Sequence, residues 1–137
     1  MTENVSSGTL MSDSTRQRLR DLRSSLLYLH KLLLDYESDA YEQAYGRVSK
    51  GMLFQLVLNH ERFAWLRPIS KLIVEIDEML SSDEPAAQAE ADALMKKVRE
   101  LLKPSETGEG FEKKYFDALQ RDPGVILTHA QVSKLLA

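Results

Sequence analysis

The only tryptophan of the chain lies in a short segment, Asn59–Pro68, that combines several side chains suited to binding a ligand. His60, Trp65 and Arg67 supply an imidazole, an indole and a guanidinium group. Because Pro68 cannot donate a helical hydrogen bond, a helix must start or kink there, which leaves backbone carbonyls for side chains, water or a ligand to satisfy. The segment is therefore either a ligand site or a helix junction anchored by Trp65 in the core, and we favour the junction.

Histidine would be the anchor of a haem or metal ion in a chain of this composition. Haem needs a single axial histidine, and His30 lies beside a long row of leucines. The second hypothesis is therefore a small-molecule or haem-binding protein with its pocket near Trp65 and His30 or His60 as polar anchor. The competing interpretation places His30 at the core edge with its polar tip in water or on a carboxylate. We favour that interpretation and expect no cofactor.

Several catalytic and metal chemistries are excluded by what the sequence lacks. Without cysteine there are no disulfides, thiolate zinc sites, iron–sulfur clusters or cysteine nucleophiles. The three histidines lie in separate segments, and no Glu-x-x-His motif of di-iron bundles is present. No Gly-x-Ser-x-Gly elbow or phosphate-binding loop occurs. We therefore expect no metal site, and the sequence leans away from an enzyme.

Charge is segregated along the first predicted helix. Basic residues dominate its first half and acidic residues its second, against the preference of the helix dipole. The residues that carry this pattern best are Arg16, Arg20, Arg23, Asp35 and Glu37. Three explanations remain open. Two copies of the helix could pair in antiparallel orientation, the acid-rich segment 75–92 of the same chain could cover the arginines, or the Arg16–Arg23 cluster could bind nucleic acid, which is the weakest of the three.

A heptad pattern predicts that the long first helix, Ser14–Tyr45, is the spine of the fold. Ser14 and Gln17 form a capping-box pattern at its start, and Gly46 follows its end. A second stripe, of Leu27, Leu34 and Tyr41, adjoins the first. The apolar positions of the main seam are Leu19, Leu22, Leu26, Leu29, Leu33, Tyr36 and Ala40.

Shorter helical patterns fill the rest of the chain. A helix over Lys50–Leu58 has almost no polar face, so we expect it to be buried. A turn is expected at Asp122–Gly124, with the last helix opening at Thr128 through a second capping box. The other predicted helices are Ile69–Leu80, Ala86–Lys103 and Phe111–Arg121. The prediction is an all-α bundle of five to six helices, with a disordered tail at residues 1–12 and one domain over residues 13–137.

Composition and charge place limits on the surroundings of the protein. The chain has 137 residues, 43% of them hydrophobic, and a net charge of −3. These values fit one soluble domain and give no electrostatic drive toward nucleic acid or anionic membranes. The N-terminus lacks a secretory signal pattern, and no apolar run approaches the length of a membrane span. We therefore expect a cytoplasmic protein that does not enter a membrane.

The leading functional hypothesis is a protein-interaction module that pairs with itself. Its support is the sustained apolar seam, the segregated charges and the lack of a catalytic constellation. The predicted partner is a second copy, with Ser14–Tyr45 in antiparallel register so that Arg16–Arg23 faces Asp35–Glu42.

Overall fold

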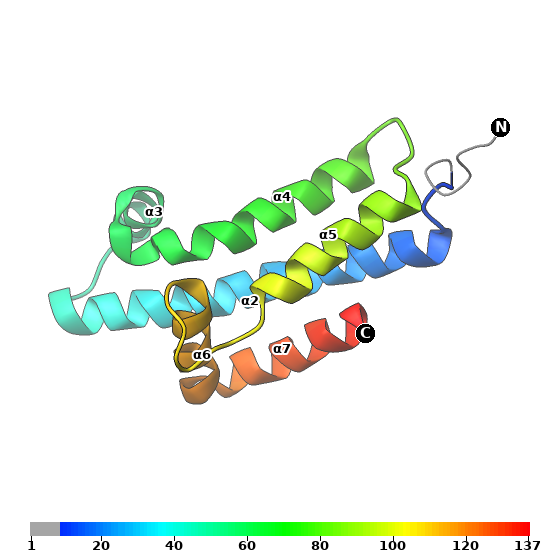
Figure 1. Cartoon of the computed structure of the whole chain (residues 1–137). Helices are drawn as coiled ribbons and strands as arrows, with labels where there is room; N and C mark the ends of the chain where they lie inside the picture. Colours follow the sequence, from blue (N-terminus) through cyan, green and yellow to red (C-terminus); the bar gives the residue numbers. More distant parts are fainter. Residues whose placement is uncertain (1–8) are drawn as a thin grey trace.

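The computed structural model describes residues 9–137, and all the regular structure in this range is helical. Over these described residues, six α-helices and one 3-10 helix follow one another and no strand is formed, so the prediction of an all-α bundle is confirmed (Figure 1). No helix in these residues is both long and apolar enough to cross a membrane. The elements are α2 (Asp13–Tyr45), α3 (Lys50–Asn59), η1 (Glu61–Leu66), α4 (Arg67–Ser81), α5 (Gln88–Leu101), α6 (Phe111–Arg121) and α7 (Pro123–Leu136).

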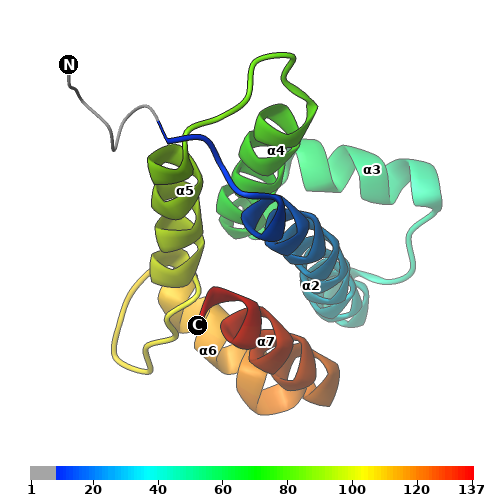
Figure 2. The same cartoon turned by 90° about the vertical axis from the view of Figure 1, so that its right-hand side faces the viewer.

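Helix α2 is the spine of the bundle, as predicted. Helices α4 and α7 run back along it, and α5 completes the packed group around its first half (Figures 1 and 2). Five leucines of the predicted seam are buried in this core, each no more than 1% exposed: Leu19, Leu22, Leu26, Leu29 and Leu33. They meet the apolar faces of α4, α5 and α7, which supply Ile69, Ile76, Val98, Val125 and Val132 among others.

The buried row of α2 departs from the heptad prediction in its last third. The seam was expected to continue through Tyr36 and Ala40, but both are only partly buried, and the next buried residue after Leu33 is Glu37. A straight α-helix has about 3.6 residues per turn, so its buried face drifts away from a strict seven-residue repeat. A carboxylate therefore lies where the heptad pattern had placed a tyrosine.

Two helix starts differ from the predicted capping boxes. Helix α2 is capped by Ser12 and not Ser14, because the Ser12 hydroxyl accepts a hydrogen bond from the Thr15 amide at 3.0 Å. Helix α7 starts at Pro123, after Asp122 accepts from the Gly124 amide at 2.9 Å. Proline suits the first turn of a helix. The amides of that turn have no carbonyl partner within the helix, so the N–H that proline lacks costs no hydrogen bond. The predicted turn therefore forms the start of α7. The predicted cap at Thr128 is wrong, because Thr128 lies inside this helix and its hydroxyl donates to the Gly124 carbonyl.

The last residues of the predicted tail are tied to the start of α5. Within residues 9–12, the Met11 amide donates to the Ala86 carbonyl, and the Gln88 amide donates to the Thr9 carbonyl, each at 2.9 Å. The Gln88 side chain also accepts from the Ser12 amide at 3.0 Å. The rest of the predicted tail, residues 1–8, lies outside the described residues. These bonds join the start of α2 to the start of α5, which lies more than seventy residues later in the sequence.

Candidate interaction surface

Helix α3 is exposed, although its apolar sequence predicted burial. No residue of α3 is buried, and Met52, Phe54 and Leu58 are 53%, 61% and 51% exposed. The exposed residues that face away from the bundle form a surface that we name the α3 outer face: Gly51, Met52, Phe54, Gln55 and Leu58. The prediction was wrong because an apolar helix needs a partner on every side to be buried, and residues 9–137 cover only one side of α3.

The inner side of α3 explains why the helix forms at this place. Leu53, Leu56 and Val57 are partly buried against the hydrophobic core. Ser49 caps the helix as predicted, because its hydroxyl accepts from the Met52 amide at 3.1 Å. The helix projects sideways from the end of α2 and the start of α4, on the opposite side of the bundle from α5 (Figure 2). Packing along one side thus leaves the other toward solvent.

Both ends of α3 are fastened to the bundle. Gly46 ends α2 with a φ of 94°, and the carboxylate of Glu42 accepts from the Val48 amide at 3.0 Å. At the other end Arg67 donates to the carbonyl of Leu58 at 3.0 Å. A side chain would be strained at the φ of Gly46, which glycine adopts freely. The outer face is therefore presented in a fixed orientation.

Glu37 connects the spine to the 3-10 helix that follows α3. One carboxylate oxygen accepts from the Trp65 indole Nε1 and the other from Arg62 Nε, each at 2.8 Å. Glu37 is 6% exposed and Trp65 9%, so the carboxylate and its hydrogen bond to the indole lie in the interior, while the Arg62 side chain is half-buried at 32% exposed. Trp65 has the position of a core anchor in a helix junction. Glu37, predicted to bind a partner, uses both oxygens within its own chain.

The residues proposed for a ligand pocket are engaged in contacts of the fold. His30 Nε2 lies 3.0 Å from the Ser70 hydroxyl, and burial lowers the pKa of His30, which favours its neutral form. His60 Nδ1 accepts from the Arg62 amide at 3.0 Å. The structure brings His60, Trp65 and Arg67 to one junction, while His30 lies about two turns of α2 before Glu37. None of these four residues lines any of the three cavities that the described residues form.

The charged residues of α2 are partly used inside the chain. Arg23 pairs with Asp77, and Arg16 donates to the Leu80 carbonyl at 3.3 Å, both on α4. Asp35 pairs with Lys31 at 2.9 Å along α2 itself. Arg20 is exposed and makes no side-chain hydrogen bond to another described residue. For Arg16 and Arg23, the structure thus shows the intramolecular arrangement, in which the segment that starts at Glu75 approaches the arginines.

Three cavities lie elsewhere in the described part of the chain. The largest of the three, about 540 Å³, lies between α4 and α5. Glutamates and apolar side chains such as Met79 and Leu94 line it, and Lys97 is bound to Glu75 at 3.0 Å. A second, of about 280 Å³, is lined by α5, α7 and the loop after α5, and includes His129. A third, of about 320 Å³, follows the end of α5. Among residues 9–137 no three His, Cys, Asp or Glu side chains converge as metal ligands would.

The α3 outer face is the largest run of apolar side chains that the described residues leave uncovered on one short element. Its position depends on contacts that only the folded chain supplies, so the apolar pattern alone could not reveal its exposure. Comparison with known proteins found no matching family model, no matching curated protein and no matching solved structure.

Proposed function

We propose that the protein is a protein-interaction module and that the α3 outer face is its binding surface. The observation that carries this proposal is the 61% exposure of Phe54 on a helix that is apolar almost all round. Helices with this composition are normally buried, and exposed apolar patches on soluble proteins mark interaction sites. An aromatic anchor of this size would contribute more to binding than any other side chain on the face.

The spacing of the apolar residues supports a protein partner. Phe54 and Leu58 are four residues apart, so they lie one above the other on the same helical face. Partners that bind a helix through a groove recognise anchors at this spacing. The surface of α2 that the sequence predicted to bind a partner has fewer free charged groups, because Arg23 and Glu37 already form ion pairs within the chain. The absence of cysteine fits a reducing compartment, and we propose a cytoplasmic location.

The test is site-specific photocrosslinking in cells that express the full chain. Benzoylphenylalanine placed at Gln55 should give discrete protein adducts, and these should disappear when Phe54→Ser is added. The matched control is the same residue at Gln120, which is exposed on α6. If Gln55 gives no adduct above the Gln120 background, the α3 outer face does not bind protein and the proposal is wrong.

A further inference from the structure

We infer that the protein bound to the α3 outer face is a second copy of this chain, packed so that the two α3 helices run antiparallel. The inference rests on the proposed function and names its partner. A twofold dimer uses the same patch on both subunits, so the patch must be complementary to itself. The α3 outer face meets this requirement in both its apolar residues and its charges.

The apolar anchors are complementary when the twofold axis passes near the middle of α3, at the level of Leu56. This arrangement sets Phe54 of one copy opposite Leu58 of the other, and the symmetry repeats the contact. Gly51 and Gln55 lie beside these contacts on the same exposed side of the helix. Two contacts between Phe54 and Leu58 would then form. They would cover side chains that are 61% and 51% exposed in the single chain.

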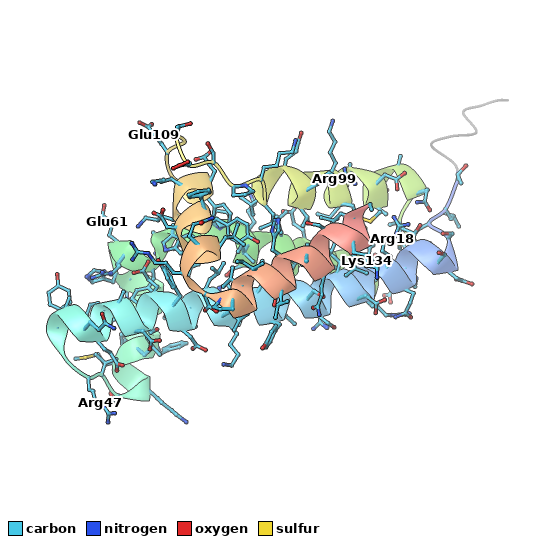
Figure 3. The ribbon with its side chains drawn as sticks, turned by 90° about the horizontal axis from the view of Figure 1, so that it is seen from below. Arg18, Arg47, Glu61, Arg99, Glu109 and Lys134 are labelled. Carbon is cyan, nitrogen blue, oxygen red and sulfur yellow. The ribbon has the colours of Figure 1, made fainter. Side chains whose placement is uncertain are left out.

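The charges at the two ends of α3 have opposite sign. Arg47 and Lys50 lie at its start and Glu61 follows its end, as the labelled Arg47 and Glu61 show in Figure 3. All three are exposed, and neither Lys50 nor Glu61 forms an ion pair with another residue of 9–137. The axis that pairs Phe54 with Leu58 also brings Lys50 to within one residue of the level of Glu61 of the second copy.

The antiparallel arrangement is the one that these charges select. A parallel pair would bring Lys50 against Lys50, and like charges at an interface disfavour association. Two basic groups follow the end of α3, and both are engaged within their own chain: Arg62 pairs with Glu37, and Arg67 donates to the Leu58 carbonyl. Helix α3 itself contains no acidic residue. Glu61 is therefore the acidic group nearest in sequence to the end of this helix, and it is the one that the second copy would bring to Lys50.

Light scattering on the purified full chain at micromolar concentrations tests the inference. We expect a dimer of twice the 15.6 kDa chain mass. Phe54→Ser should give a monomer with unchanged circular dichroism. Lys50→Glu should weaken the dimer about tenfold, because the symmetry repeats each exposed charge contact. Adding Glu61→Lys to Lys50→Glu should restore most of the affinity. The control is Lys96→Glu, the same charge change on an exposed residue of α5.

The possible outcomes separate this inference from the proposed function. A wild-type monomer whose Gln55 crosslinks to a different protein would leave the function standing and overturn self-pairing. A monomer that gives no Gln55 adduct would overturn both. A monomer that floats with anionic lipid vesicles through Phe54 would also overturn self-pairing and assign α3 to a membrane surface. A dimer that resists Phe54→Ser, or a charge swap that does not recover affinity, would place the interface elsewhere.

Discussion

The indole nitrogen of Trp65 donates to a carboxylate oxygen of Glu37 at 2.8 Å, across 28 positions of the sequence. Arg62 donates to the other oxygen of the same carboxylate, so a single buried side chain of α2 holds two residues of η1. Because η1 follows α3 directly, these bonds also help to set where α3 leaves the bundle. A buried carboxylate thus orients an exposed apolar helix.

Glu37→Ala is expected to destabilise the fold by about 3–5 kcal/mol, because it leaves a half-buried guanidinium and a buried indole N–H without their acceptor. Urea unfolding measures the change, and the indole N–H resonance of Trp65 should move. The matched control is Asp39→Ala, an exposed acid two positions further along α2 that should cost less than about 0.5 kcal/mol. Equal stabilities for the two variants would show that the carboxylate of Glu37 does not hold η1 to α2.

The leucine seam separates neighbouring positions sharply, and Leu26 and Leu27 give the clearest pair. Leu26 is 1% exposed and Leu27 is 44% exposed. We expect Leu26→Asp to unfold the protein or nearly so, since it places a charge in the centre of the core. Leu27→Asp makes the same chemical change at a position near solvent and should leave the thermal midpoint almost unchanged. If Leu26→Asp melts within a degree or two of the parent protein, the seam is not the core.

The fold was largely predictable because apolar spacing governs which helix face is buried. Leu19 to Leu33 recur at helical spacing, and this pattern was sufficient to identify α2 and its core side. The candidate site was not predictable in the same way. Burial of Glu37 depends on the small drift of a straight helix from the heptad, and exposure of Phe54 depends on which neighbours the chain brings to α3. Both depend on tertiary packing, which the local spacing of apolar residues does not determine.

Buried Tyr115 and partly buried His129 form a pair that should make stability depend on pH. Tyr115 Oη lies 2.6 Å from His129 Nδ1. Burial raises the pKa of Tyr115, so its hydroxyl stays protonated and is able to donate to Nδ1 of the neutral imidazole. Burial also lowers the pKa of His129 from 6.5, so the folded protein favours the neutral imidazole. The same histidine in the unfolded chain binds a proton at a higher pH than it does in the folded protein. The stabilising contribution is therefore present above pH 6.5 and is lost as the pH falls through the folded pKa.

Tyr115→Phe tests this pair. Without the hydroxyl, Nδ1 of His129 loses its donor, and we expect the pKa of His129 to rise toward 6.5. The fall in unfolding free energy between about pH 7 and about pH 5 should become shallower. NMR titration measures the pKa of His129 in Tyr115→Phe and in the parent protein. His30, which contacts Ser70 on α4, should titrate as in the parent. An unchanged His129 titration would show that the tyrosine hydroxyl does not control its protonation.

Two glycines that flank the start of α3 should respond in opposite directions to alanine. Gly46 has a φ of 94° and a ψ of 172°, a conformation almost restricted to glycine, so Gly46→Ala should cost about 1–3 kcal/mol. Gly51 lies within the helix, and a Cβ there meets nothing within 4 Å, so Gly51→Ala should stabilise by about 0.4–1 kcal/mol. Both are measured by thermal unfolding in the Phe54→Ser background, where association does not contribute. A Gly46→Ala variant as stable as its parent would mean that residues 46–49 leave α2 by another backbone path, and the fixed presentation of the α3 outer face would lose its support.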